Sequence, residues 1–398
     1  MIQDTNTDFM ASTQKNLSYS SPFNVTSWDD LLFILEYHIP VALALNKAIT
    51  PIWYAIGLVG NVTSAAVWLS SGLRMSNTAA YYLASLAIAD LLFLILQVFY
   101  ELEYPWLVRA LDLQGWCQIW NILNMAVGYI CVLLVFGFTF ERFLSICYPF
   151  KSERFSKTSR SKRVIFLIVL VSFLVALPQG YFWDVRYNGC HVRISLVMQR
   201  ERSLYSIWNW GSEMIMFGLV PLVVLVLNIC VLHKIKHAGQ LKLGDTSASN
   251  SHKRYISTTV TLLWVSFYLI LTTLPVTLMF AMQTKFTLGS PMSLEAMADD
   301  PHWRTFFSYQ FARTVIKEIG LSHYACNLFI YCFTCKKFRF HLFRLLFGPG
   351  VVCFGSDDSD SKTGRQPSQS FQMEQKLLPY ERSPNMSTGV KHTDVSIH

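Results

Sequence analysis

The segment FERFLSICYPF, residues Phe140–Phe150, places a glutamate and an arginine, Glu141 and Arg142, side by side at the end of a long apolar run. The run before it starts at Gln118 and is long enough to cross the roughly 30 Å hydrocarbon layer of a membrane as a helix. Charged side chains are costly in the middle of a membrane but far less so at its edge. We therefore expect FERFLSICYPF to mark the aqueous end of a transmembrane helix.

The composition of the whole chain is also that of a membrane protein. Of its 398 residues, 52% are hydrophobic and only 15% are charged, whereas soluble chains carry about 25% charged residues. Seven apolar runs of the required length predict an all-α membrane protein with a seven-transmembrane helix bundle. The runs are Ala48 to Leu73, Thr78 to Tyr100, Gln118 to Phe140, Val164 to Trp183, Leu204 to Leu232, Tyr255 to Thr284 and Phe306 to Cys335.

Basic residues in the connections predict which ends of the helices face the cytoplasm. The connection between the third and fourth runs holds six lysines and arginines against a single acid, Glu153. Short loops with such a positive excess lie on the cytoplasmic side. We therefore expect a multi-pass plasma-membrane protein with an extracellular amino terminus and a cytoplasmic carboxy terminus. This topology explains the formal charge of +8, so we expect no nucleic-acid partner.

The segments on either side of the bundle have distinct expected roles. Asn16 and Asn24 lie in glycosylation motifs that face outward in this topology. The run KKFRFHLFRLLFG alternates basic and apolar residues at helical spacing and predicts a short helix along the membrane surface. The organisation expected is an extracellular, glycosylatable amino terminus (1–47), the bundle (48–335), an amphipathic membrane-surface helix (336–350) and a disordered cytoplasmic tail (351–398).

The predicted topology divides the cysteines into two groups, those at the outer side of the membrane and the rest. Of nine, only Cys117 and Cys190 fall outside or at the outer boundary, so we expect them to form a disulfide that ties the fourth-to-fifth connection to the third helix. Two free thiols are the alternative. Cys353, beyond the amphipathic helix, is a candidate for palmitoylation, with a free surface thiol as the alternative.

Polar residues inside the apolar runs are informative because each is costly in a membrane. Asp90 interrupts the second run, while Asn61 lies in the first and Asn327 in the seventh. We expect these three residues to form a buried polar cluster at the middle of the membrane. The alternative is that each side chain is satisfied locally by backbone groups or water.

Taken in order, these residues resemble the rhodopsin-like, class A, G-protein-coupled receptors over about residues 48–347. The resemblance rests on one motif in each helix: GN at Gly60, LAIAD ending at Asp90, Cys117 with Cys190, ERF from Glu141, Pro178, Pro221, Pro275, and NLFIY from Asn327 to Tyr331. It implies a switch, controlled by an extracellular ligand, that opens its cytoplasmic face to a heterotrimeric G protein.

The resemblance also implies roles for single residues. Glu141 holds Arg142 inward in the inactive receptor, and Arg142 reaches the G protein in the active one. Asn327 and Tyr331 support the open state, while Pro221 and Pro275 kink the fifth and sixth helices. One departure stands out: Thr273 occupies the position of the family's usual tryptophan two residues before Pro275, so the relay from ligand to core must use other residues.

The expected ligand is a peptide. Amine receptors of the family carry an aspartate where this chain has Asn124, and opsins a lysine where it has Leu321. The outer half of the bundle instead offers charged, amide and aromatic side chains suited to peptide groups, although packing or interface anchoring explains the aromatic ones equally well. The candidates are Glu101, Trp120, Asn124, Glu213, Arg313 and Lys317. The segments YACNLFIYCF and TTLP resemble invertebrate neuropeptide receptors of the FMRFamide-receptor-like type.

Other function classes are less well supported. The sequence has no phosphate-binding loop, no zinc-protease motif and no nucleophile elbow, so we expect no enzyme, no cofactor and no metal site. The expected partners besides ligand and G protein are membrane lipid, and arrestin and receptor kinases acting on the tail. The alternatives kept open are a non-peptide receptor, a receptor-like protein that does not signal, and a membrane transporter, which the lack of internal repeats disfavours.

Overall fold

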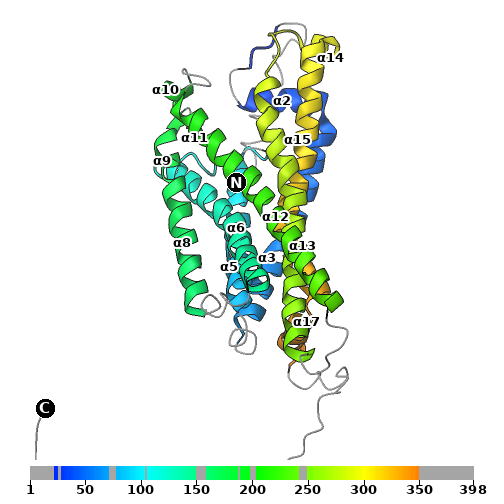
Figure 1. The fold of residues 1–398 in the computed structure, drawn as a ribbon. Helices are drawn as coiled ribbons and strands as arrows, with labels where there is room; N and C mark the ends of the chain where they lie inside the picture. Colours follow the sequence, from blue (N-terminus) through cyan, green and yellow to red (C-terminus); the bar gives the residue numbers. More distant parts are fainter. Residues whose placement is uncertain are drawn as a thin grey trace, which may run out of the picture. The chain divides into compact units, whose positions relative to one another are not determined.

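The computed structural model describes residues 22–25, 28–70, 78–103, 105–148, 158–186, 189–197, 203–241 and 249–348. Long helices make up most of this part of the chain (Figure 1). The first four are α3 (Pro40–Leu69), α5 (Thr78–Glu103), α6 (Trp116–Cys147) and α8 (Thr158–Ala176). They are followed by α11 (Leu204–Glu213), the π-helical turn η2 (Met214–Leu219), α12 (Val220–Leu241), α13 (Ser249–Met282), α15 (Pro301–Ala325) and α16 (Asn327–Thr334).

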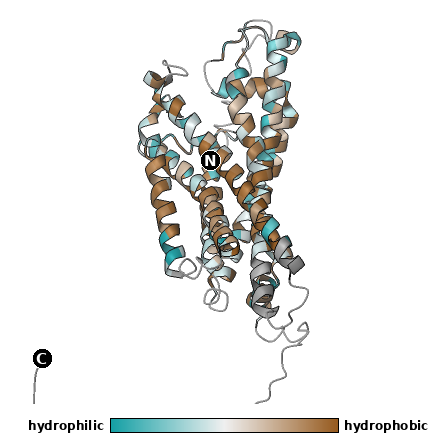
Figure 2. Cartoon of the chain, viewed as in Figure 1, coloured by the Kyte–Doolittle hydropathy of each residue, from teal (hydrophilic) through white to brown (hydrophobic). Residues whose placement is uncertain are grey.

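Most of these helices are apolar along much of their length, as Figure 2 shows for α8. Within the described residues, six helical stretches are long and apolar enough to cross a membrane. The helix α15 is not among them, and it carries Arg313, Lys317 and Glu318. The first span is longer than expected from the sequence, because α3 begins at Pro40 rather than near Ala48.

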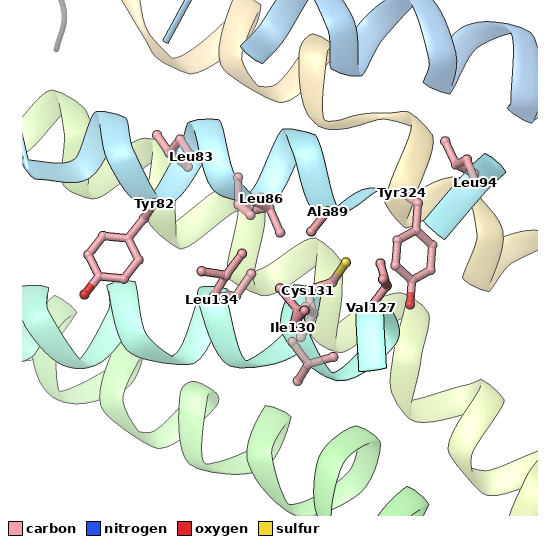
Figure 3. Packing of buried hydrophobic residues seen from close by; sticks show 14 of the residues in the cluster. Tyr82, Leu83, Leu86, Ala89, Leu94, Val127, Ile130, Cys131, Leu134 and Tyr324 are labelled. Carbon is pink, nitrogen blue, oxygen red and sulfur yellow. The ribbon is translucent and has the colours of Figure 1, made fainter. Parts of the chain in front are cut away.

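The helices pack into a closed arrangement in which α6 is central. The contacts run from α3 to α5, α5 to α6, α6 to α8 and α12, α12 to α13, α13 to α15, and from α15 back to α3. The side chains between α5 and α6, among them Leu86, Ile130 and Leu134, are almost fully buried (Figure 3). Burial of such side chains stabilises the packing of the helices. Where the side chains leave water, the gain is hydrophobic, and where they leave lipid, it comes from close van der Waals contact.

One end of the bundle carries a disulfide between Cys117 and Cys190 and is called the disulfide end here. Its connection contains the short helix α9 (Gln179–Phe182) and an antiparallel hairpin of β1 (Trp183–Arg186) and β2 (Gly189–Val192). The chain is therefore mostly helical, as expected, and the hairpin is a β element that the all-α prediction did not contain. The expected disulfide is present, and it fastens β2 to the start of α6.

A second hydrophobic core lies at the disulfide end, separate from that of the bundle. It joins α2 (Trp28–His38), the short helix α14 (Leu294–Asp299) and the first turns of α15 through Ile34, Met297, Trp303 and their neighbours. Phe23 adds a backbone bridge to Met292, with its N–H donating to the Met292 carbonyl at 3.0 Å. We call the group of α2, α14 and residues 301–307 of α15 the cap.

The opposite end of the bundle carries Arg142 and is called the arginine end. There α16 is followed by α17 (Lys336–Phe347), whose Phe338 is fully buried while Phe343 and Leu346 are exposed. Gly348 follows with φ of 78°, a left-handed conformation that glycine adopts without a side-chain clash and that commonly ends helices. The short helix expected after the seventh span is thus present, and Cys353 with the rest of the tail lies outside the described residues.

Candidate functional site

A cavity of about 270 Å³ opens between the spans toward the disulfide end. Its wall is formed by α5, α6, the end of α11, the π-helical turn η2, α13 and α15, so every residue that lines it depends on the packing of the bundle. Most of the lining is apolar or aromatic. The polar and charged side chains in it include Gln97, Asn124, Glu213, Thr273, Thr277 and Lys317.

Lys317 contributes a cation to the cavity, and its charge is already paired. Its Nζ donates to the buried carboxylate of Glu101 on α5, and it lies 4.9 Å from the ring centroid of Tyr100. Lys317 remains partly exposed while Glu101 is buried, so the ammonium compensates a carboxylate that has left water, and the ring of Tyr100 adds a cation–π contact. The pair fixes α5 to α15 and leaves little net charge at this corner of the cavity.

Glu213 contributes the carboxylate of the cavity lining and differs from Lys317 in its surroundings. It is the last residue of α11, directly before the π-helical turn, and it lines the cavity. Among the residues that the structure describes, no lysine or arginine forms a salt bridge with it. A carboxylate in an enclosed, mostly apolar site favours a cationic partner, so this corner suits a basic group on a ligand.

The other ligand candidates divide into residues that line the cavity and residues that do not. Asn124 lines it and accepts a hydrogen bond from Gln97 Nε2 at 3.1 Å. Trp120 is buried in the bundle, where its indole N–H donates to the Leu96 carbonyl at 3.0 Å, and Arg313 is exposed on α15. The structure therefore brings Asn124, Glu213 and Lys317 together, with Glu101 adjoining them, and places Trp120 and Arg313 elsewhere.

Below the cavity, Tyr324 connects its lining to the polar residues of the bundle centre. Its ring stacks on that of Phe93 at 4.0 Å between centroids, and both residues line the cavity. Its backbone carbonyl accepts a hydrogen bond from Asn61 Nδ2 at 2.7 Å. Figure 3 shows Tyr324 beside Leu94 and Val127 at the same level of the bundle.

The polar residues at the bundle centre are fully buried, and two of the three expected partners meet. Asn327 Nδ2 donates to Asp90 Oδ2 at 2.7 Å, which joins α16 to α5. Asn61 uses its amide on the Tyr324 backbone, so it joins the cluster through the main chain of α15 rather than through the Asp90 carboxylate. The side-chain partners of Asn61 were not predictable from its position in the sequence.

At the arginine end, Arg142 is packed inside the bundle. Its side chain is 4% exposed, its Nη2 donates to Thr78 Oγ1 at 3.3 Å, and its guanidinium lies 5.3 Å from the ring centroid of Phe138. Glu141 accepts a hydrogen bond from Ser161 Oγ of α8 at 3.1 Å. We call this arrangement, with Arg142 buried, the closed state.

Tyr331 is also buried in the closed state. Its ring packs at 5.4 Å from that of Trp68 on α3 and at 5.3 Å from that of Phe338 on α17, measured between centroids. Pro275 lies within α13, and Pro221 lies in the first turn of α12, directly after the π-helical turn. The two prolines expected to bend the fifth and sixth helices thus lie just after a π-helical turn and inside a long helix. Bends in helices occur at such positions.

Two groups at this site had no counterpart among the sequence predictions. Glu318, buried between α15 and α3, accepts hydrogen bonds from Asn46 Nδ2 at 2.9 Å and Thr50 Oγ1 at 2.7 Å. Phe217 and Thr277 line the cavity beside Thr273, which the sequence had marked only as a departure from the family pattern. Neither Phe217 nor Thr277 carries a charge, and both residue types are common in membrane helices, so no sequence signal pointed to them.

Comparison with known proteins agrees with this geometry. The family model described as "7 transmembrane receptor (rhodopsin family)" matches residues 60–331. Among curated proteins, the neuromedin U receptor homolog nmur-2 of Caenorhabditis elegans is 35% identical over 136 residues, covering 33% of this chain and 33% of its own. The pyrokinin-1 receptor of Drosophila melanogaster is 31% identical over 153 residues, covering 38% and 35%.

The neurotensin receptor type 1 of Rattus norvegicus is 36% identical over 133 residues, covering 31% of this chain and 30% of its own. The matched part of the chain thus spans about a third of the length of each of these three relatives. The family model, in contrast, matches well over half of the chain and includes the residues of both the cavity and the arginine end. The chain belongs to the rhodopsin family of seven-transmembrane receptors.

Proposed function

We propose that this receptor binds an extracellular peptide in the cavity at the disulfide end and, in response, activates a heterotrimeric G protein at the arginine end. The observation that carries the peptide assignment is the cavity lining: an acidic side chain, Glu213, without a described basic partner, set among aromatic and amide groups. A basic residue of a peptide supplies the missing charge, and the cavity holds the end of such a peptide rather than all of it.

The names of these relatives support the same class of ligand. They are receptors for neuromedin U, pyrokinin and neurotensin. These names direct the choice of candidate ligands more specifically than the sequence resemblance to FMRFamide-like receptors does. Both sets belong in a test of the proposal.

The charge of the connections between helices supports an orientation of the receptor in the membrane. Connections at the arginine end are rich in lysine and arginine, which favours a cytoplasmic location. The disulfide end then faces outward with Asn24, which is exposed and available for glycosylation; Asn16 lies outside the described residues. The carboxy-terminal tail, with Cys353 and its serines, would meet membrane lipid, receptor kinases and arrestin in the cytoplasm.

The direct test is a screen of peptides on cells that express the chain. Neuromedin U-, pyrokinin-, neurotensin- and FMRFamide-like peptides would be applied, with biosensors for several G-protein classes as the measurement. We expect at least one basic peptide to produce dose-dependent G-protein activation that is absent from untransfected cells. Surface-expressed protein that binds a peptide without activating any G protein would instead identify a non-signalling receptor.

A further inference from the structure

The fifth span changes its backbone hydrogen-bond pattern at the junction of η2 and α12. In η2 the bonds run over five residues, as from the Val220 N–H to the Ile215 carbonyl, and Pro221, which follows at once, has no N–H to donate. From the sixth span, the Thr277 hydroxyl on α13 donates to the Phe217 carbonyl at 2.8 Å. The contact therefore ties the fifth and sixth spans next to a point where the fifth lacks a backbone hydrogen bond.

This hydrogen bond lies in the wall of the cavity. Phe217 and Thr277 both line it, as does Glu213 immediately before the π-helical turn. The ring of Phe217 packs at 5.8 Å from that of Tyr129, measured between centroids. A ligand that enters the cavity and contacts Glu213 is therefore close to both ends of the bond.

Neighbouring hydroxyls on α13 do not make this kind of contact. Thr272 donates to the carbonyls of Tyr268 and Leu269, and Thr273 donates to that of Leu269, all within α13. Thr277 also lies 3.0 Å from the carbonyl of Thr273, so its single hydroxyl proton is shared between its own helix and the fifth span. When the contact with Phe217 is lost, the hydroxyl therefore keeps an acceptor within its own helix.

We infer that the Thr277 hydroxyl is a positioning group that holds α13 against η2 in the closed state, and that ligand in the cavity frees α13 by displacing this hydrogen bond. The inference rests on the proposed function, since it supplies the relay from cavity to arginine end. A ligand shifts the equilibrium between the closed and open states only if it interacts differently with the two. A ligand that displaces this hydrogen bond removes a contact that stabilises the closed state, so the receptor shifts toward the open state.

The test compares three variants at equal surface expression. Thr277→Val removes the hydroxyl at nearly constant volume, Thr277→Ser keeps it, and Thr272→Val removes a hydroxyl that bonds only within α13. We expect Thr277→Val to raise ligand-independent G-protein nucleotide exchange roughly 2- to 10-fold, the factor that one net hydrogen bond represents. Thr272→Val should match the original receptor, and Thr277→Ser, which keeps the hydroxyl, should raise exchange less than Thr277→Val does. Thr277→Ala provides the same test if the valine variant does not reach the surface.

A second measurement separates this inference from the proposed function. Nitroxide labels at the exposed positions 166 on α8 and 264 on α13 report the position of the sixth span without any G protein. We expect Thr277→Val to shift the distance distribution between the labels and Thr272→Val to leave it unchanged. A shifted distribution with no G-protein activation in any variant would support the contact and contradict the proposed coupling.

The opposite results overturn the inference. If a peptide activates the receptor but Thr277→Val leaves both exchange and label distances as they were, the proposed function stands and the role of Thr277 is wrong. If Thr272→Val raises exchange as much as Thr277→Val, the effect comes from weakening α13 itself and not from its contact with η2.

Discussion

At the scale of single residues, the charges inside this bundle differ in how they are compensated. Lys317 is paired with Glu101, and Arg142 bonds to Thr78 and stacks on Phe138. A buried carboxylate such as that of Glu101 is tolerated because it is paired, and breaking a buried ion pair is strongly destabilising. Glu213 is the carboxylate that lines the cavity, and no described lysine or arginine pairs with it. It is therefore the residue at which a ligand gains most from carrying a cation.

Replacement of Glu213 by glutamine tests this view. We expect Glu213→Gln to weaken binding of a basic peptide roughly 10- to 100-fold, because a charge-assisted hydrogen bond is lost while the shape of the side chain is kept. Competition binding on intact cells is the measurement. Glu295→Gln, a matched change on the exposed face of α14, should leave affinity unchanged. Equal affinity of both variants would show that the peptide does not contact Glu213.

Arg142→Ala tests the output end. Since Arg142 lies at the end of the bundle opposite to the cavity, we expect the variant to lose agonist-driven nucleotide exchange while surface expression and peptide binding persist. Arg344→Ala removes an exposed cation from α17 at the same end and serves as the control. Exchange that survives in Arg142→Ala would refute the assigned contact with the G protein.

At the scale of elements, the cap holds the start of α15 against α2 and α14. Asp300 caps the helix by accepting from the N–H groups of His302 and Trp303 at 2.9 Å, and Trp303 then packs in the core shared with α2 and α14. The charged residues that weaken the apolar pattern of the seventh span lie further along α15, where Lys317 pairs with Glu101 on α5 and Glu318 accepts hydrogen bonds from α3.

The cap also contains a histidine whose protonation opposes docking. His38 stacks on Phe307 at 4.4 Å between ring centroids. Burial lowers the pKa of His38 from its ordinary value of 6.5, and a hydrogen bond with the Leu294 backbone opposes this shift in part. The undocked histidine takes up a proton more readily than the docked one. Docking of α2 is therefore strongest above a pH of about 6.5 and weakens as the pH falls below it.

Hydrogen exchange measures this pH dependence. We expect the amides of α2 to exchange faster at a pH of about 5.5 than at about 7.5, after correction for intrinsic rates, in receptor reconstituted into nanodiscs. In His38→Gln, which has no titrating group at this position, the difference between the two pH values should disappear. A pH difference of equal size in that variant would assign the effect to another group.

At the scale of the whole bundle, the two functional regions lie at opposite ends and are joined through its centre. Tyr324 connects the cavity to Asn61, and the Asp90–Asn327 hydrogen bond joins α5 to α16, which continues to Tyr331. Helix α6 contacts most of the other spans and carries both Cys117 and Arg142. Movement of one helix can therefore be transmitted through packed contacts from one end of the bundle to the other.

The orientation of this bundle in the membrane is testable through glycosylation. Asn24 is exposed at the disulfide end, and we expect it to carry a glycan that enzymatic deglycosylation removes. Asn24→Gln should lower the apparent mass of the receptor by one glycan. Asn385→Gln, which alters the same kind of motif in the tail, should have no effect. Loss of a glycan in the tail variant would reverse the proposed topology.

Much of this architecture was determined by the sequence alone, because the relevant constraints are local. A run of apolar residues must form a helix in lipid to satisfy its own backbone, so the seven spans and the family resemblance followed from length, composition and motif order. The pairing of Cys117 with Cys190 followed from topology, since the other cysteines lie where disulfides are rare.

Only the tertiary structure decided which polar residues meet. The contact of Lys317 with Glu101, the bond from Asn61 to the Tyr324 backbone and the donation from Thr277 to Phe217 each join helices far apart in the chain. They depend on how the helices are rotated and, for Thr277, also on the π-helical turn η2, and neither is encoded in hydropathy. The sequence could therefore list costly polar side chains, while their partners required the packing of the bundle.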